Sequence, residues 1–265
     1  MFQDALETAG HFTFPYVGVR RRNDGEVFST VGALVIINAD GWCLTAAHVV
    51  DEIRKAHASV QSKAQPTTLS HHAEIWAVPG FARSKPRMAQ AHVDSAADLA
   101  AIRIEPFDAG QFERPPVFRS LVSPVRPGLS LCRVGYPFHK VEATFDEDAG
   151  NFDVKTGFPV PRFALEGMVS RFHNVVVEGR EPPVRFIETS TPGLRGQSGG
   201  PLIDVEGRIC GMQSHTAHLD LGFDAAFERE GERVTERQFL NVGRAVHVEQ
   251  IMAFLDAKQI DYRHG

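Results

Sequence analysis

The sequence predicts an all-β fold, built as a barrel or a sandwich. Short apolar runs and period-2 alternation recur along the chain, turn residues (Gly, Pro and Asp) separate them, and only two segments show helical character. The 265 residues fit one large domain or two of about 130 residues each. With 43% hydrophobic and 23% charged residues, the composition is ordinary for a globular protein with a sizeable core.

The strands are predicted from apolar runs bounded by turn residues. "VGALVIINADGWCLTAA" (31–47) is typical of two strands joined by a turn at Asn38–Gly41, and "LAAIRIE" (99–105) predicts a further strand. Six later runs share this pattern: 129–137, 164–172, 174–179, 184–190, 200–214 and 240–246.

Two helices are predicted. The first is a short one in "VVDEIRKAH" (49–57). The second is C-terminal, in "VEQIMAFLDAKQI" (248–260), where apolar residues at helical spacing form a stripe that can lie on the body of the protein. That stripe consists of Val248, Ile251, Met252 and Leu255.

A proline-rich connector divides the chain into two β subdomains. It carries Pro106, Pro115, Pro116, Pro124 and Pro127, which favour an extended backbone, and we place the boundary near residue 118. The predicted subdomains are therefore 1–118 and 119–265. Three polar segments are interpreted as surface loops: 78–97, 138–162 and 217–238. His71, His72 and His92 are interpreted as loop residues.

Composition excludes several classes of protein. The net charge of −5 and the scattered basic residues argue against a nucleic-acid partner. No apolar run approaches the about 20 residues of a membrane helix, and the N-terminus has no signal-peptide pattern. No metal-ligand spacing is present, so we expect neither a metal nor a cofactor. Cys43, Cys132 and Cys210 lie in apolar runs, which predicts buried free thiols and a cytoplasmic protein.

The stretch "GLRGQSGGPLIDVEGRICGM" (193–212) surrounds one serine with glycines. Gly196 precedes Ser198, and Gly199 and Gly200 follow it. Glycine is used where the backbone must turn tightly or be approached closely. A serine on such a turn, beside unobstructed backbone N–H groups, has the geometry of a covalent nucleophile, although a structural turn between two strands explains the glycines equally.

A nucleophilic serine requires a histidine base and an acid that orients it. His48 is selected from twelve histidines because it lies at a strand-to-helix junction in "CLTAAHVVD". Asp98 directly precedes the strand "LAAIRI", whereas Asp94, four residues earlier, is interpreted as a loop carboxylate. The chain order His48, Asp98, Ser198 is one of the known orders of a Ser-His-Asp triad.

Three motifs in this order, "TAAHVV", "DLAAIRI" and "GQSGGPLID", resemble the trypsin/chymotrypsin-type serine peptidases. "IETSTPGLRGQSGGPLIDVEGRICGM", together with "VGYPF" and "EGMVSR", is most similar to the bacterial HtrA/Deg-type peptidase domains. The resemblance covers residues 15–258. It implies two packed antiparallel β-barrels with a C-terminal helix, in which the first barrel carries His48 and Asp98 and the second carries Ser198.

The resemblance also implies the roles of other residues. The backbone N–H groups of Gly196 and Ser198 would form the oxyanion hole. The pocket for the side chain before the scissile bond would have five lining residues: Thr191, Pro192, Gln213, Ser214 and His215. No acidic residue stands at its base, so a preference for Arg or Lys is not expected. A polar or small side chain is expected instead, or an acidic one if His215 is protonated.

The chain departs from its relatives at several points. Gln197 stands where secreted enzymes carry an Asp that pairs with a new N-terminus, so no activation by N-terminal cleavage is expected. HtrA-type proteins usually carry PDZ modules after the peptidase, and the sequence ends at Gly265, so we expect a domain without one. The segment 138–162 is longer than expected and is interpreted either as a lid over the cleft or as a segment that displaces the oxyanion turn in a resting state.

The sequence therefore predicts a serine endopeptidase that acts on protein or peptide substrates, alone or as a homo-oligomer or with a regulatory protein. One alternative is a catalytically silent trypsin-like module that binds peptides by adding a strand to a sheet edge. The intact triad argues against it. A second alternative is an esterase with the same triad, but "GQSGG" lacks the α/β context of such enzymes.

Overall fold

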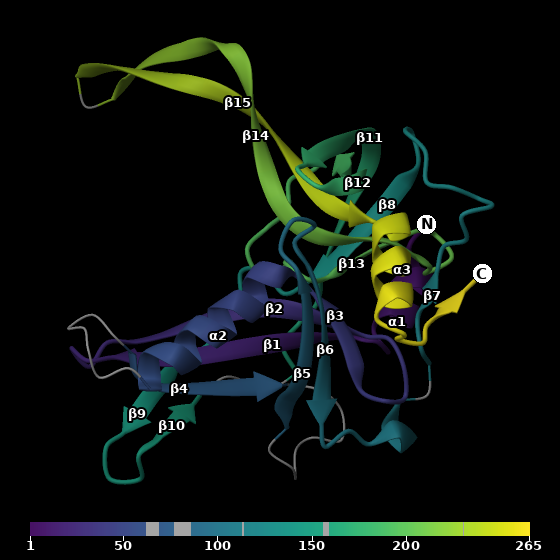
Figure 1. Cartoon of the computed structure of the whole chain (residues 1–265). Helices are drawn as coiled ribbons and strands as arrows, with labels where there is room; N and C mark the ends of the chain where they lie inside the picture. Colours follow the sequence, from purple (N-terminus) through teal and green to yellow (C-terminus); the bar gives the residue numbers. More distant parts are fainter. Residues whose placement is uncertain (62–68, 77–85, 113, 156–158, 230) are drawn as a thin grey trace.

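In the part of the chain that it describes, the computed structural model contains two large sheets, a small hairpin and three α-helices (Figure 1). It describes residues 1–61, 69–76, 86–112, 114–155, 159–229 and 231–265. The all-β prediction is confirmed, as is the C-terminal helix, α3 (Val248–Ala257).

The first sheet is formed by the first six strands of the chain. Its order is β4-β1-β2-β3-β6-β5, and every pairing in it is antiparallel. Within the described residues β4 and β5 are its two free edges, so the sheet is an open half-barrel. The strands are β1 (Thr13–Arg22), β2 (Val27–Ile36), β3 (Trp42–Thr45), β4 (Leu69–Trp76), β5 (Arg87–Asp94) and β6 (Leu99–Glu105).

The second sheet closes on itself. Its order is β13-β8-β11-β12-β15-β14-β7-β16, and the additional pairing of β13 with β14 completes a ring of six antiparallel strands. The ring consists of β8 (Ser130–Gly135), β11 (Phe163–Val177), β12 (Arg180–Thr189), β13 (Pro201–Ile203), β14 (Ile209–Arg229) and β15 (Glu232–His247). Two short strands, β7 (Val117–Phe118) and β16 (Arg263–His264), extend the sheet beside β14 through parallel pairings.

One hydrophobic core runs through both sheets. Its fully buried side chains include Leu44 and Ile102 from the first sheet and Leu131 and Ile187 from the second. The chain crosses from one sheet to the other between the end of β6 and the start of β7. The division at residue 118 remains a prediction. All three cysteines are buried and unpaired, as predicted.

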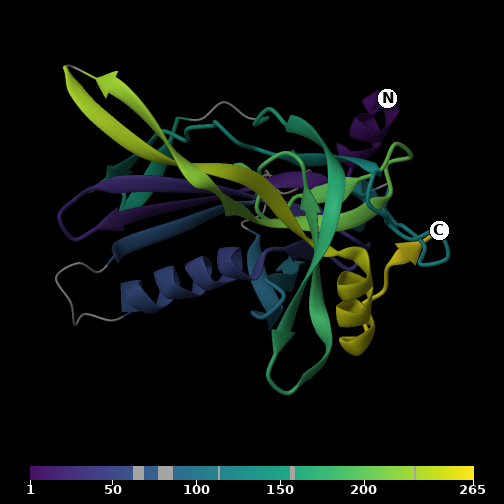
Figure 2. The same cartoon turned by 90° about the horizontal axis from the view of Figure 1, so that it is seen from above.

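The helices differ in extent from the prediction. α2 (Ala47–Gln61) is longer than the predicted 49–57. Its buried stripe, Val49, Val50, Ile53 and Ala56, lies within the predicted range, and the last turn adds no buried residue that the sequence pattern could show. α2 lies along β4 in both views (Figure 1, Figure 2). α1 (Gln3–Ala9) was not predicted, since seven residues are too few to show helical periodicity. Among the described residues, no helix is long and apolar enough to cross a membrane.

The prediction of a loop over 217–238 is wrong. β14 and β15 remain paired far beyond the barrel and project as a two-stranded arm, the yellow-green ribbons that leave the body in Figure 1. The dense charge of "EREGERVTER" (228–237) favours a loop, although Leu219, Leu221 and Phe223 alternate along β14 as in a strand. In the arm, Leu221 and Phe223 are exposed. Residue 230 lies outside the described residues.

The two other predicted loops also contain strands. Segment 138–162 includes the hairpin of β9 (Ala143–Asp146) and β10 (Asn151–Val154), which packs on β1 of the first sheet. Residues 87–94 of the segment 78–97 form β5, and residues 78–85 lie outside the described residues. His71 and His72 lie on β4 and His92 on β5, so the prediction that these histidines lie in loops was wrong.

Candidate active site

Strand register brings His48 and Asp98 together. The antiparallel pairing of β3 with β6 aligns Thr45 with Ala100, so the residues just after β3 lie opposite those just before β6. His48 is in the first turn of α2, immediately after β3, and Asp98 immediately precedes β6. Asp98 has a φ of 52°, in the left-handed region that aspartate adopts more readily than most residues.

Asp98 holds the His48 imidazole by several contacts. Nδ1 of His48 lies 3.0 Å from both carboxylate oxygens, and the backbone N–H of His48 donates to Oδ1 at 3.0 Å. The hydrogen bond to Asp98 raises the pKa of His48 above its ordinary value, although partial burial opposes the shift. Burial raises the pKa of Asp98, but the hydrogen bonds from His48 and Ser214 outweigh this effect and lower it overall. The carboxylate is therefore charged at neutral pH and leaves Nε2 of His48 as the ring's acceptor.

Ser198 lies on a turn of the second sheet that rests against the first. The backbone N–H of Ala33, in β2, donates to the carbonyl oxygen of Ser198 at 2.9 Å. Gly199 has a φ of 83°, and a Cβ at this position would lie 2.3 Å from the Ala33 carbonyl oxygen. Only glycine permits this approach, which places Ser198 beside the end of β3, where His48 follows.

A β-bulge at Ser214 connects the two halves of the site. β14 pairs with β15 with a register shift between Gln213 and His215, so Ser214 is the extra residue of the bulge. The Ser214 hydroxyl donates to Oδ2 of Asp98, and its carbonyl oxygen accepts from the Ser198 hydroxyl at 3.4 Å. Within the described residues this is the only hydrogen bond of the Ser198 side chain. Ser214 thus contacts Ser198 directly and is linked to His48 through Asp98.

The turn before Ser198 presents two backbone donors. The N–H groups of Gly196 and Ser198 have no acceptor among the described residues. Gly196 has a φ of 93°, and its carbonyl oxygen accepts from the N–H of Tyr136 at 2.9 Å. A Cβ at Gly196 would lie 2.4 Å from the Tyr136 carbonyl oxygen, so glycine is required there. Two free donors beside a serine hydroxyl form an arrangement that can hold a negative oxygen.

The five residues expected to line the substrate pocket lie on two sides of one region. Thr191 and Pro192 are half-buried on the segment after β12, while Gln213 is buried on β14 and His215 is exposed there. The Ser214 side chain points to Asp98 instead. We call the region between Thr191–Pro192 and Gln213–His215 the specificity pocket, because the resemblance predicts that it receives the side chain before the scissile bond.

A model of the trypsin-like peptidase domain matches residues 32–212, which is more than half of the chain and includes His48, Asp98 and Ser198. The chain belongs to the trypsin-like peptidase domain family. No curated protein matches it significantly in sequence.

Solved structures share the fold. The Rv3671c protease from M. tuberculosis, in its active form, aligns with a TM-score of 0.52 and 15% identity over 98% of this chain and 86% of that one. An HtrA-type protease, AlgW, in a structure with a tripeptide, aligns with a TM-score of 0.53 and 16% identity over 97% of this chain and 63% of that one. The fold is therefore that of trypsin-like proteases of the HtrA type.

Sequence analysis did not identify Arg133, a buried charged residue that contacts the region predicted to form the specificity pocket. Arg133 lies on β8, is 2% exposed and donates to both sides of the pocket. Its Nε donates to Oε1 of Gln213 at 2.6 Å, and its Nη1 donates to the carbonyl oxygen of Pro192 at 2.8 Å. A Cβ at Gly243 would lie 2.2 Å from Nη2, so the guanidinium occupies the space that this glycine leaves. The signal in the sequence was an arginine inside the apolar run 129–137.

Arg133 has only neutral acceptors, and it takes part in none of the ion pairs between described residues. Burial lowers the pKa of Arg133 to about 10, so the guanidinium is still charged at neutral pH. Burial, and then the charge of Arg244, lower the pKa of His215 below its ordinary value. His215 is therefore neutral at neutral pH, and the cation of the specificity pocket is Arg133 rather than the protonated His215 considered from the sequence.

Proposed function

We propose that this protein is a serine endopeptidase that uses His48, Asp98 and Ser198. The observation that carries the proposal is the link through Ser214, which binds Asp98 by its hydroxyl and Ser198 by its carbonyl oxygen. Residues from both sheets are thereby held together at one place. The proposed substrates are proteins or peptides, as membership of the trypsin-like peptidase domain family suggests.

The proposed chemistry is acyl transfer. The Ser198 oxygen attacks the peptide carbonyl carbon while Nε2 of His48 takes the hydroxyl proton. The carbonyl oxygen becomes negative and is held by the N–H groups of Gly196 and Ser198, a contribution of about 10²–10³ in kcat for one such donor. His48 then gives the proton to the leaving amine, and water hydrolyses the acyl-enzyme by the same steps.

The hydrogen bond from the Ser198 hydroxyl to the Ser214 carbonyl oxygen directs the proposed nucleophile to Ser214 rather than to His48, as expected before substrate binds. At 3.4 Å it is long for an O–H donor, so its loss costs little. Rotation of the Ser198 side chain frees the hydroxyl to reach His48, and catalytic hydrogen bonds are often formed only when substrate is bound.

We further propose that the residue before the scissile bond is acidic. Arg133 carries a buried positive charge with no carboxylate to neutralise it, and an isolated buried charge is unfavourable. A glutamate or aspartate side chain in the specificity pocket would supply that carboxylate, in place of one of the neutral acceptors. Arginine forms bidentate pairs with carboxylates, and these are stronger than its bonds to neutral oxygens.

A fluorophosphonate probe tests the proposed nucleophile. The probe reacts with an activated serine oxygen and releases fluoride, so the wild-type protein is expected to be labelled and Ser198→Ala to lose the label completely. Ser170→Ala, at an exposed serine on β11, is the matched control and is expected to be labelled like the wild type. Labelling is read by intact-protein mass spectrometry. Equal labelling of Ser198→Ala and the wild type would refute the proposal.

Peptide and ester digests separate the remaining functions. Cleavage of casein or of a peptide library by the wild type, lost in Ser198→Ala, supports a peptidase. Ester hydrolysis without peptide cleavage would support the esterase. Peptide binding by a protein that is neither labelled nor active would support the silent peptide-binding module.

The loss of peptidase activity at low pH is expected to follow the protonation of His48. Its imidazole must be neutral to accept the Ser198 proton, and the hydrogen bond to Asp98 raises its pKa above the ordinary 6.5. The protonated, inactive form therefore persists to higher pH than in an isolated histidine. We expect kcat/KM to fall as the pH is lowered through a midpoint above 6.5, as measured on a neutral substrate. A midpoint below that value would contradict the described His48–Asp98 contact.

A further inference from the structure

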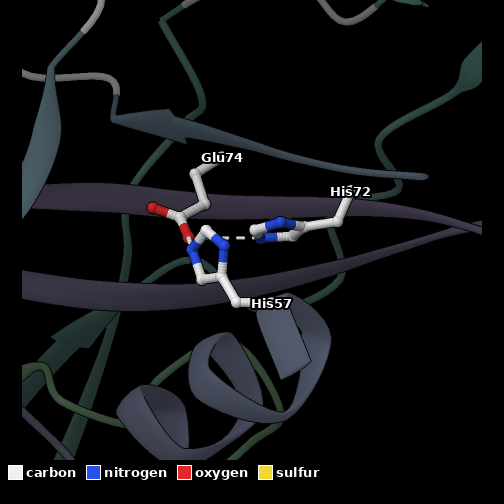
Figure 3. A group of neighbouring side chains, drawn as sticks. All are labelled: His57, His72 and Glu74. Atoms are coloured by element: carbon white, nitrogen blue, oxygen red, sulfur yellow. Dashed lines mark hydrogen bonds and ion pairs between the residues drawn. The ribbon is translucent and has the colours of Figure 1, made fainter. Parts of the chain in front are cut away.

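A second cluster of chemically active side chains lies on the opposite end of α2 from His48. His57 on α2 faces His72 and Glu74 on β4, and the three side chains point toward one another (Figure 3). His72 and Glu74 are two residues apart on a strand, so they share the face of the sheet that α2 covers. The packing of α2 on β4 therefore places His57 beside His72 and Glu74, which the strand already holds together.

The distances suit a small metal ion. Nε2 of His57 and Nε2 of His72 lie 3.0 Å and 3.1 Å from Oε1 of Glu74, and the three ligand atoms all lie within 4.8 Å of one another. Ligands of a tetrahedral zinc ion lie about 2.0–2.2 Å from the metal, which places them about 3.4 Å from one another. The two nitrogen–oxygen distances would change by a few tenths of an ångström, and the two imidazole nitrogens, no more than 4.8 Å apart, would turn toward the same ion.

Among the described residues, one of the three proposed ligands, His72, has a buried ring nitrogen without a hydrogen-bond partner. The His72 side chain is only 6% exposed, and its Nε2 is buried with no hydrogen bond, because its approach to Glu74 is not aligned for one. A buried polar atom without a partner is destabilising, and a metal ion would supply the partner. Glu74 is 11% exposed, whereas His57 is 55% exposed, so the fourth coordination position would face solvent.

The neighbouring cation Arg20 is paired with Glu52, so Glu74 remains available as a metal ligand. Arg20 on β1 pairs with His72 in the strand register, and its Nη1 donates to Oε2 of Glu52 at 2.9 Å. The carboxylate that pairs with Arg20 is therefore that of Glu52, on α2.

We propose that His57, His72 and Glu74 bind a divalent transition metal, with zinc as the preferred ion. Two imidazoles and one carboxylate with an open fourth position form a ligand set typical of zinc. The site departs from our expectation of no metal, which rested on sequence spacing. His57 and Glu74 are 17 positions apart and meet only because α2 packs on β4.

The proposed ion would act on structure rather than on the reaction. His48 and His57 lie on the same helix, nine residues and thus about 14 Å apart along its axis. The metal would fix the far part of α2 to the first sheet and so hold the helix that carries His48. The proposal does not depend on peptidase activity.

Zinc titration of the chelator-treated full chain tests the site. We expect about one zinc per chain by calorimetry and by elemental analysis after gel filtration. Saturation at 100 times Kd is expected to raise Tm on the order of 5–10 °C.

Three variants locate the ion. His57→Ala, at an exposed side chain that should not disturb folding, and Glu74→Gln, which keeps the shape, are expected to weaken zinc binding at least about 100-fold. His71→Ala is the matched control, because His71 lies on β4 but on the other face, against Phe145. It is expected to bind zinc like the wild type. Absence of stoichiometric binding, or equal binding by His57→Ala and the wild type, would overturn the proposal.

Discussion

Asp98→Asn is expected to lower kcat by about 10⁴-fold without unfolding the protein. The amide keeps the size of the carboxylate, but its NH₂ group donates a hydrogen bond where Asp98 accepts one from Nδ1 of His48. The imidazole would then carry its proton on Nε2 and could not take the Ser198 proton. Steady-state kinetics on a peptide substrate measure the loss, and circular dichroism verifies the fold.

Asp94→Asn is the matched control for this variant. Asp94 is the other carboxylate of the same turn, but its Oδ1 is 2.7 Å from Nη1 of Arg180 and accepts from the N–H of Ala97. It does not contact His48, so kcat is expected to stay within a few-fold of the wild type. Equal losses in the two variants would show that the turn, and not the orientation of His48, determines activity.

Arg133 is expected to determine which peptide bonds are cleaved. For matched substrates with Glu or Gln before the scissile bond, we expect the wild-type kcat/KM to favour Glu by about 10–100-fold, because a hydrogen bond to a charged group contributes about 1.5–3 kcal/mol. Arg133→Met removes the charge and is expected to abolish the preference. The measurement is the ratio of kcat/KM for the two substrates, which does not depend on the amount of active enzyme.

Further variants keep this prediction testable if Arg133→Met folds poorly. Arg133→Lys retains the charge but loses the planar fork, so a reduced preference for Glu is expected. Arg195→Gln removes an exposed cation from the turn before Ser198 and is expected to keep the full preference. Fluorophosphonate labelling of each variant shows whether Ser198 is still activated. A labelled wild type that cleaves Glu and Gln substrates equally would refute the role of Arg133 but not the peptidase.

Position on the strands explains why the candidate site could be predicted from sequence. His48 follows β3, Asp98 precedes β6 and Ser198 precedes β13, and each is marked by its neighbours: an apolar strand on one side, and glycines or a helix on the other. These signals are local, so they are visible in the order of residues. Asp98 is favoured over Asp94 in the sequence because it directly precedes the strand "LAAIRI". The structure adds the register, in which the alignment of Thr45 with Ala100 places Asp98 opposite the start of α2.

Local signals failed where solvent or distant partners decide the structure. The arm of β14 and β15 is held by the pairing of its own two strands. The dense charge of "EREGERVTER" (228–237) favours a loop there, although Leu219, Leu221 and Phe223 alternate as in a strand. Ser214 links Asp98 to Ser198 because it is the extra residue of a β-bulge, and no local sequence pattern predicts that bulge.

The sequence by itself determined the all-β class, the C-terminal helix and the three residues of the proposed triad, because periodicity, turn residues and glycine spacing are short-range properties. Only the tertiary structure decided that Arg133 contacts the region predicted to form the specificity pocket and that His57 meets His72 and Glu74. Arg133 and Gln213 are 80 positions apart, and their contact exists only because the second sheet closes into a ring. The chemistry of a side chain is given by its type, but its partners are given by packing between elements far apart in the chain.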